Sequence, residues 1–421
     1  MQDKNVKEEI LTRVYEFLFS SNDAHDPAAL RNVTEQIIEE LENRLKREFS
    51  SEEKENIFKT VEDEVFGLGP LEQLLRDEDI SEIMINGPGK VYIEREGKKV
   101  LSDIRFRDEN HLRNIIEKLL SSSRRRVDEL NPYVDVSLPG GARVNIVIQP
   151  VSPRGAVVTI RKFLKSLNKI EDLIEEGTLN ERMAQFLINC VKAKVNILFS
   201  GATGSGKTTT LNILSQYIPS SERIITIEDT LELRLKQEHV VSLETRQTNI
   251  EGKGRISIRD LFVNSLRMRP DRIILGEIRH EEALDLLQAI ASGHTGSLAV
   301  IHGSSALDAI SRLEIMVLTS GINLPVWALR KLIANSINLI VQHEQLPDGS
   351  RKIVNITEVA GMENEEIILQ DIFYFDFQQL DNDGNVIGQF RCSGIVPMFL
   401  ERFKKYGIEA REDFFKKDEE I

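Results

Sequence analysis

Residues 195–216 read VNILFSGATGSGKTTTLNILSQ, in which an apolar run, a glycine-rich turn and a helical pattern follow one another directly. The segment 201–208, GATGSGKT, fits the pattern G-x-x-x-x-G-K-[ST]. Glycines allow backbone N–H groups to turn toward a phosphate, and the helix that follows points its positive dipole end at the same place. The stretch therefore predicts a strand, a phosphate-binding loop and a helix. The alternative is a glycine-rich turn with a chance lysine, which the flanking strand and helix disfavour.

The loop also supplies the candidate ligand contacts. Lys207 is expected to neutralise β- and γ-phosphate oxygens, and Thr208 is expected to hold Mg²⁺. The remaining candidates for nucleotide binding are Gly201, Ala202, Thr203, Gly204, Ser205, Gly206 and Thr209. The predicted ligands are therefore ATP and Mg²⁺.

Short apolar runs surround the loop from about residue 180 onward. They are separated by helical patterns and read VNILFSG, RIITIED, RIILGEI, SLAVIHG and INLIVQH. Continuous apolar runs such as residues 273–275 are typical of parallel strands covered on both faces, so we predict an α/β sheet. Beyond about residue 345, PDG at 347–349 and DNDG at 381–384 indicate hairpins, and a charged helical pattern ends the chain.

Acidic residues follow two of the predicted strands. Glu277 ends the run RIILGEI, whereas Glu228, Asp229 and Glu232 follow the run RIITI. Ligands of open α/β sheets bind at the carboxyl ends of the strands, so these carboxylates are expected near the nucleotide. One cluster would position Mg²⁺ through water, and the other would orient or deprotonate the attacking water. The alternative is that they are solvated turn residues.

Two histidines flank one predicted strand in SGHTGSLAVIHG, residues 292–303. His294 precedes the strand, and a packed or capping role is favoured for it. His302 ends the strand at the edge that also carries the loop. A γ-phosphate sensor and an ordinary packed histidine both remain open for His302.

The part of the chain before residue 180 has a different texture. Apolar stripes at 10–18 and 33–45 predict two amphipathic helices, whose stripes need a cover from a partner or from the next domain. From Phe66 onward, short alternating runs bounded by Gly and Pro predict a mixed α+β domain. We divide the chain into an N-terminal helical segment (1–60), an α+β domain (61–160), a linker (161–180) and a P-loop domain (181–421).

Composition limits the partners. The 421 residues include 68 acidic and 54 basic side chains, for a net charge of −14, which argues against wrapping of nucleic acid by bulk electrostatics. The triple Arg124-Arg125-Arg126 is better explained as a solvated face or an interface. No secretory signal and no run of 18 apolar residues is visible, so we expect a cytoplasmic protein that reaches a membrane only through partners.

Taken together, the motifs resemble one family. GATGSGKTT, TIEDTLELRL, RIILGEIRHEEALDLLQA and SGHTGSLAVIHG occur in the order of the type II/IV secretion ATPase superfamily. FGLGPLEQLL, EIMINGPGKVYIER, LPGGARVNIVIQP, VTIRKF and NIEGKGRISIRDLFVNSLRMRP look like its tight-adherence (Flp) pilus branch. The resemblance covers about residues 65–375. It implies a hexameric, RecA-like motor in which a flexible linker joins an N-terminal domain to the ATPase domain, with ATP bound between them.

The resemblance also implies roles for particular residues. Lys207 and Thr208 match the Walker A contacts, and Glu277 matches the Walker B acid. Glu228 is the acidic-box candidate for activating water, and His302 matches the histidine-box position.

Two arginines come from the N-terminal domain in this comparison. Arg143 in GARVN and Arg161 in TIRKF match arginines that the family directs toward the nucleotide phosphates. Guanidinium groups that arrive on domain closure stabilise transition-state charge, and such a group is worth about 10³–10⁵ in rate. An ordinary surface ion pair is the alternative for both arginines.

The sequence departs from the branch in three places. Residues 246–248 read Arg-Gln-Thr where the branch usually has prolines, and Thr295 stands where its histidine box reads GHDG. The four-cysteine zinc module of type II secretion ATPases is absent, because Cys190 and Cys392 are far apart in the sequence.

The function predicted from these motifs is an ATPase motor that drives pilin assembly or protein export through an inner-membrane platform. Two alternatives stay open. A nucleic-acid translocase on the same core would show DNA-stimulated turnover and salt-dependent DNA binding. A non-hydrolysing scaffold that uses nucleotide as an assembly switch would keep its function after Glu228→Gln.

Overall fold

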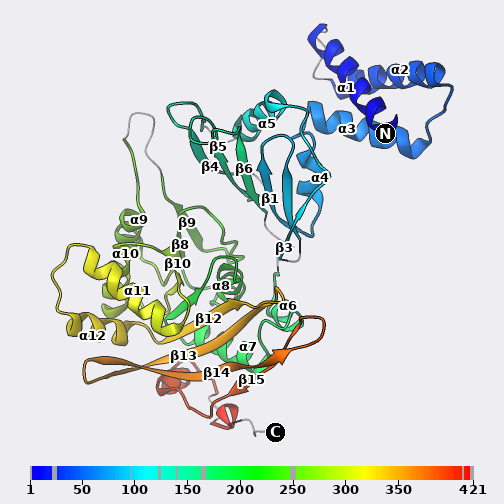
Figure 1. The fold of residues 1–421 in the computed structure, drawn as a ribbon. Helices are drawn as coiled ribbons and strands as arrows, with labels where there is room; N and C mark the ends of the chain where they lie inside the picture. Colours follow the sequence, from blue (N-terminus) through cyan, green and yellow to red (C-terminus); the bar gives the residue numbers. More distant parts are fainter. Residues whose placement is uncertain are drawn as a thin grey trace. The chain divides into compact units, whose positions relative to one another are not determined.

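The structure is a computed structural model that describes residues 2–20, 26–95, 97–121, 125–138, 141–162, 167–246, 253–409 and 412–417. The chain divides into two units, residues 1–165 and 166–421, which Figure 1 colours from blue to cyan-green and from green to red. Arg124, Gln247 and Thr248 lie outside the described part of the chain. None of the described helices is long and apolar enough to cross a bilayer.

Three helices begin the first unit: α1 (Gln2–Ser20), α2 (Pro27–Leu45) and α3 (Ser51–Val65). Their apolar stripes cover one another in a shared core that includes Ile10, Val14, Ile38, Leu41, Phe58 and Val61. The sequence analysis missed α3, although Ser50 and Glu53 form the capping box that starts it. The helix continues past the boundary predicted at residue 60.

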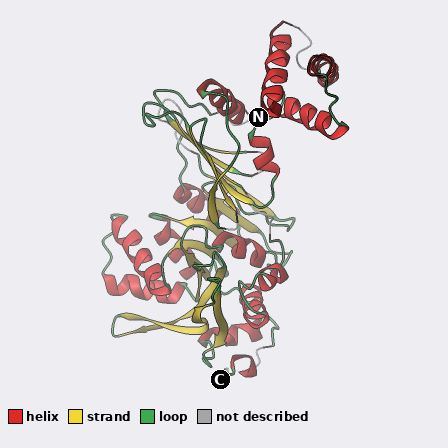
Figure 2. Cartoon of the chain, turned by 45° about the vertical axis from the view of Figure 1, so that its right-hand side comes forward, coloured by secondary structure: helices red, strands yellow, loops and turns green. Residues whose placement is uncertain are grey.

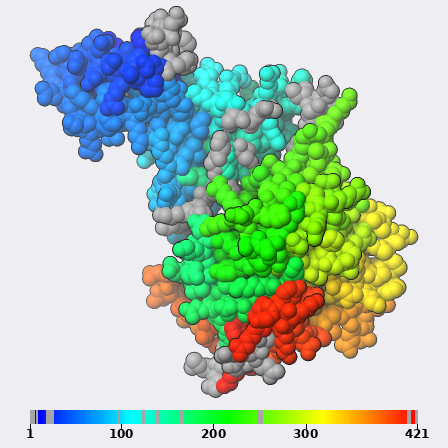
Figure 3. Space-filling model, turned by 180° about the vertical axis from the view of Figure 1, so that it is seen from behind, coloured from blue at the N-terminus to red at the C-terminus, as the bar shows by residue number. Residues whose placement is uncertain are grey.

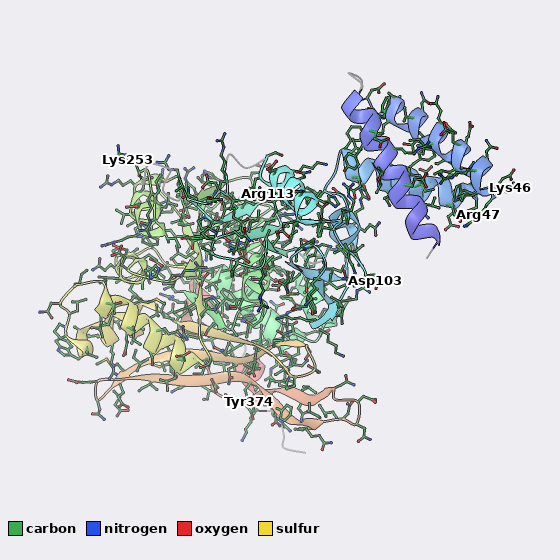
Figure 4. All side chains as sticks on the ribbon, turned by 45° about the horizontal axis from the view of Figure 1, so that its top comes forward. Lys46, Arg47, Asp103, Arg113, Lys253 and Tyr374 are labelled. Carbon is green, nitrogen blue, oxygen red and sulfur yellow. The ribbon has the colours of Figure 1, made fainter. Side chains whose placement is uncertain are left out.

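The end of α2 shows how these helices stop. Lys46 has a left-handed backbone with φ 52°, and its N–H donates to the carbonyl of Glu42. Arg47 follows, stacks over the Phe49 ring at 5.5 Å and pairs with Glu53 at 2.5 Å. Figure 4 labels Lys46 and Arg47 at this end of the helix. The chain therefore turns sharply here and begins α3 within a few residues.

The rest of the first unit is an antiparallel sheet with two helices, α4 (Leu71–Arg76) and α5 (Glu109–Ser121). The strands lie in the order β3-β2-β1-β6-β5-β4. Their bounds are Ile80–Asn86 (β1), Val91–Arg95 (β2), Lys98–Leu101 (β3), Tyr133–Ser137 (β4), Arg143–Val147 (β5) and Val157–Arg161 (β6). One face of this sheet packs with α4 and α5, and alternation therefore turns the polar residues of the strands to the other face.

Helix α3 is tied to α5. The Lys118 ammonium donates to the carbonyls of Glu64, Val65 and Gly67 at 2.8, 3.1 and 3.0 Å, which satisfies the free carbonyls at the end of α3. The buried Glu64 carboxylate lies 3.0 Å from His111 Nε2. Helix α3 thus belongs to the core of the three N-terminal helices and also contacts α5, which packs on the sheet.

The second unit contains a larger sheet, and Figure 2 draws the strands in yellow. The strands lie in the order β15-β14-β13-β12-β7-β11-β10-β8-β9. From β9 to β12 all neighbours are parallel, and from β12 to β15 they are antiparallel. The bounds are Ile197–Gly201 (β7), Ile224–Glu228 (β8), Val240–Glu244 (β9), Arg272–Ile278 (β10), Leu298–His302 (β11), Leu339–Gln345 (β12), Arg351–Glu363 (β13), Glu366–Leu380 (β14) and Val386–Cys392 (β15). All five predicted strands are confirmed, and β9 is an addition.

Helices cover both faces of this sheet, as the continuous apolar runs predict. One core joins the sheet to α6 (Ile170–Glu175), α7 (Glu181–Lys192) and α8 (Lys207–Ser215). The other joins it to α9 (Ile258–Ser265), α10 (Glu282–Ala291), α11 (Ala306–Thr319) and α12 (Val326–Ser336). Successive residues of β7 alternate between the two cores, with Leu198 in the second and Phe199 in the first.

The C-terminal residues pack back onto the first of these cores. Both predicted hairpins occur, at the β12–β13 and β14–β15 turns. A short helix α13 (Glu401–Lys405) follows, and Phe403 and Phe415 stack around Phe186 of α7. Figure 3 shows the red C-terminal segment lying against the green surface of the second unit. The α/β fold class predicted from the sequence is confirmed, and the smaller α+β part precedes it.

Candidate active site

The loop between β7 and α8 has the backbone that its glycines predict. Gly201, Gly204 and Gly206 have φ of 152°, 79° and 96°, a region that side chains with a Cβ rarely adopt. A Cβ on Gly201 would also lie 2.5 Å from the carbonyl oxygen of His343, so only glycine fits there. Gly206 is the N-cap of α8, and the N–H groups of Lys207, Thr208 and Thr209 therefore begin the helix with no acceptor inside it. The N–H groups that begin a helix point along its axis and make this a site for an anion.

Lys207 lies within the loop and is 6% exposed. Its Nζ donates to the carbonyls of Gly201 and Ala202 at 2.9 and 2.6 Å, and Ser205 Oγ donates to the same Ala202 carbonyl at 2.8 Å. The loop carbonyls thus hold the Lys207 ammonium beside the N-terminus of α8. This places a fixed positive charge beside the N–H groups that would receive phosphate.

Glu277 lies at the end of β10, within a chain of charged groups. Its Oε1 is 2.8 Å from His302 Nε2, and its Oε2 accepts a 2.8 Å bond from Arg279, which also pairs with Asp229 at 3.2 Å. Burial raises the pKa of Glu277, but Arg279, His302 and Lys207 together lower it below its ordinary value. Glu277 is therefore ionised at neutral pH and can only accept hydrogen bonds.

His302 is uncharged at neutral pH, unlike Glu277. Burial and the nearby Lys207 charge lower the pKa of His302, and Glu277 opposes this only in part. The imidazole is therefore neutral at pH 7, and its Nε2 carries the proton that it donates to Glu277. The structure thus places His302 against Glu277, whereas a contact with γ-phosphate stays a prediction.

Glu228 ends β8 in a buried position and is 2% exposed. Its Oε2 accepts the N–H groups of Glu232 and Leu233 at 2.7 and 2.9 Å, which fixes the carboxyl group in one orientation. β8 and β10 are parallel neighbours, so Glu228 passes next to Gly276. The two predicted acidic clusters therefore lie together at the strand ends.

Gly276 makes room for that carboxylate, because a Cβ there would lie 2.8 Å from Glu228 Cγ. We expect Gly276→Val to displace Glu228 and to lower kcat for ATP hydrolysis about 100-fold, as small misplacements of catalytic groups do. Steady-state ATPase assays check this. Gly89→Val is the matched control, since a Cβ at Gly89 meets nothing within 4 Å. A Gly276→Val protein with the kcat of Gly89→Val would contradict the steric argument.

Arg279 and His343 were not singled out by the sequence analysis. Arg279 follows Glu277 by two residues, and a cation so close to a strand-end acid is the signal that was available. His343 lies under the loop, where its Nε2 is 3.0 Å from Thr210 Oγ1 on α8. Burial lowers the pKa of His343 to about 4, so the ring is neutral and connects β12 to α8.

His294 lies at the other end of the sheet. It precedes β11, whereas the P-loop follows the carboxyl end of the parallel neighbour β7, and its Nδ1 is 3.2 Å from the Ala289 carbonyl of α10. The favoured packed role therefore agrees with its position. The neighbouring Gly296 faces Arg272, a fully buried side chain that donates to Glu222 at 2.6 Å and to two carbonyls.

The two candidate arginines belong to the first unit and are direct neighbours there. Arg143 of β5 stands opposite Arg161 of β6 in the antiparallel register, and Arg161 stands opposite Glu82 of β1, with Nε 4.0 Å from its carboxylate. Both arginines lie on the face of the sheet that α5 does not cover. Arg125 donates to the Asp135 carbonyl at 2.8 Å on the edge strand β4, which agrees with a structural role for that arginine.

A parallel sheet with a P-loop after one strand, acids after two others and a histidine between them defines a RecA-like P-loop ATPase.

Comparison with known proteins identifies the family. The sequence model "Type II/IV secretion system protein" matches residues 64–360, and the chain belongs to this family of secretion ATPases. Type IV secretion system protein VirB11 of Bartonella henselae is 34% identical over 330 residues, covering 69% of this chain and 91% of VirB11. Putative conjugal transfer protein Rv3659c of Mycobacterium tuberculosis is 30% identical over 311 residues, covering 72% of this chain and 88% of the relative.

A solved structure shares the fold. The pilus retraction motor PilT with bound ADP superposes with a TM-score of 0.51 at 22% identity, covering 72% of this chain and 80% of PilT. The family match begins at residue 64, so α1, α2 and all but the last two residues of α3 lie outside it.

Proposed function

We propose that this ATPase is a homohexameric motor that powers Flp-type pilus assembly, or a related protein secretion, from the cytoplasmic face of the inner membrane through platform proteins. The observation that carries the proposal is the common strand edge of P-loop, Glu228 and Glu277, because a motor must hydrolyse the nucleotide as well as bind it. The sequence blocks similar to the tight-adherence branch support the pilus role. The relatives add that VirB11 is a secretion system protein and that PilT is a pilus retraction motor.

In the proposed reaction, residues of the second unit bind ATP and activate the attacking water. Lys207 and the first N–H groups of α8 bind the phosphates, and Glu228 takes the proton of the attacking water. The donors fit Mg²⁺, which favours oxygen ligands, phosphates and retained waters: Thr208 would hold it through its hydroxyl, and the ionised Glu277 through water. When bound, Mg²⁺ neutralises charge on the β- and γ-phosphate oxygens.

Arg143 and Arg161 complete the site in this proposal. They are register partners on the face of the sheet opposite α5, and two neighbouring guanidinium groups could contact one polyanion at once. Closure of the first unit over ATP would bring them to the phosphates, and loss of phosphate would release them. In a ring with heterologous contacts, each closure would shift the next subunit.

Lys207→Ala tests the proposal at its base. Loss of the ammonium is expected to weaken ATP binding and to lower hydrolysis about 100- to 1,000-fold, because one preorganised cation on the phosphates is removed. The measurements are steady-state ATPase activity of the purified protein and surface pili or exported protein in cells that carry only the variant. Lys331→Ala, an exposed lysine on α12, is the control. Normal pili and secretion with Lys207→Ala would refute the motor function.

A further inference from the structure

Arg351 is a cation beside the P-loop that the assignments above do not include. It is the first residue of β13 and stands opposite Gln345 at the end of β12. β12 in turn neighbours β7, and His343 lies beside Gly201 where β7 enters the loop. The β12–β13 hairpin therefore continues past the end of β7, beside the loop.

The Arg351 side chain lies along the turn that precedes Lys207. Its Nε donates to the carbonyl of Gly204 at 2.8 Å. Its Cδ lies 3.7 Å from the position that a Cβ on Gly206 would occupy, and Gly206 is the N-cap of α8. This contact holds the guanidinium beside the turn, and the group carries two further nitrogens that can donate to an anion.

No carboxylate in the described part of the chain pairs with this guanidinium. Among the residues that the structure describes, the Gly204 carbonyl is the one hydrogen-bond partner of Arg351, and it forms no ion pair. Asp348 in the same hairpin instead accepts the Ser350 N–H and hydroxyl at 2.9 and 2.7 Å and the Val386 N–H at 2.9 Å. A guanidinium, the Lys207 ammonium and a helix N-terminus thus gather at one loop, and like charges held together repel unless an anion lies between them.

We propose that Arg351 is a nucleotide-binding residue that donates to the α- or β-phosphate, an inference that rests on the ATP site proposed above. The glycine-rich turn of such loops holds the α- and β-phosphates, whereas the lysine after it reaches the β- and γ-phosphates. Arg351 contacts the turn and not the lysine. The phosphates that Arg351 would contact are therefore the α- and β-phosphates, which ATP and ADP share.

Arg351→Gln and Arg351→Lys test this assignment in the full-length protein. Calorimetric titration with ATP and with ADP is expected to show both affinities weakened about 10- to 100-fold in Arg351→Gln, because a charge-assisted hydrogen bond to phosphate is lost. The lysine variant keeps the charge without the fork and is expected to fall between Arg351→Gln and the unchanged protein. KM for ATP should rise in step, with kcat at saturating ATP changed by no more than about threefold.

Lys352→Gln is the matched control. It removes the same charge from the next residue, whose Nζ donates to the Gly177 carbonyl at 3.0 Å, away from the loop. Its affinities should equal those of the unchanged protein. Arg351→Gln that binds both nucleotides normally, or that loses affinity for ATP alone, overturns the assignment, and so does an equal loss in Lys352→Gln. None of these outcomes touches the motor proposal, which stands or falls with Lys207→Ala.

Discussion

Arg143→Ala is expected to slow ATP hydrolysis about 1,000-fold or more while ATP still binds. A guanidinium that reaches the phosphates only on closure stabilises charge that develops in the transition state, and such arginines contribute about 10³–10⁵ in rate. The loss should therefore appear in kcat, with KM for ATP little changed. Arg161→Ala should behave in the same way, since the two residues are register partners on β5 and β6. Steady-state kinetics of the purified protein measure both.

The control for the arginines is Arg113→Ala. Arg113 is an exposed arginine of α5, the helix that packs on the other face of this sheet, and Figure 4 labels it. It should retain normal kcat. If Arg143→Ala and Arg161→Ala hydrolyse ATP at the rate of Arg113→Ala, both arginines are ordinary surface residues and closure of the first unit does not complete the site.

Glu228→Gln is expected to retain ATP and to lose about 10²–10⁴ in kcat. The amide keeps the size of the carboxyl group and can still accept the N–H groups of Glu232 and Leu233, so the local fold should survive. It cannot take a proton from water, and a general base contributes rate of that order. Rapid-quench measurement of a single turnover separates this loss of chemistry from slow product release.

Glu244→Gln is the matched substitution for this test. Glu244 stands opposite Glu228 in the parallel register of β8 and β9 but is exposed. It should hydrolyse ATP normally. A Glu228→Gln protein with normal turnover would exclude Glu228 as the base, and normal pili without turnover would favour a scaffold that uses nucleotide as a switch.

Local patterns were sufficient to predict most of the second unit. A strand that is buried on both faces appears in the sequence as an apolar run with few polar residues. β7, β8, β10, β11 and β12 could therefore be predicted. β9 was missed because it is an edge strand and its residues, VVSLE, are only half-buried or exposed. Helix α3 was also missed, although Ser50 and Glu53 of its capping box are visible in the sequence.

Contacts between distant segments were beyond the sequence. The acids Glu228 and Glu277 could be predicted to share an edge, because strand ends of a parallel sheet meet there. That β8 lies directly beside β10 is a property of the strand order, and only this neighbourhood explains why position 276 is glycine. Arg351 shows the same limit, since its contact with Gly204 joins two segments far apart in the sequence.

The buried Arg272 changes how variants of the histidine box should be interpreted. A Cβ on Gly296, whose φ is 80°, would lie 2.3 Å from Arg272 Nη1. Any larger residue would therefore force a guanidinium out of its carbonyl and carboxylate partners, and an uncompensated buried charge costs about 3–5 kcal/mol. A loss-of-function allele at Gly296 in a genetic screen would thus report a shortage of folded protein.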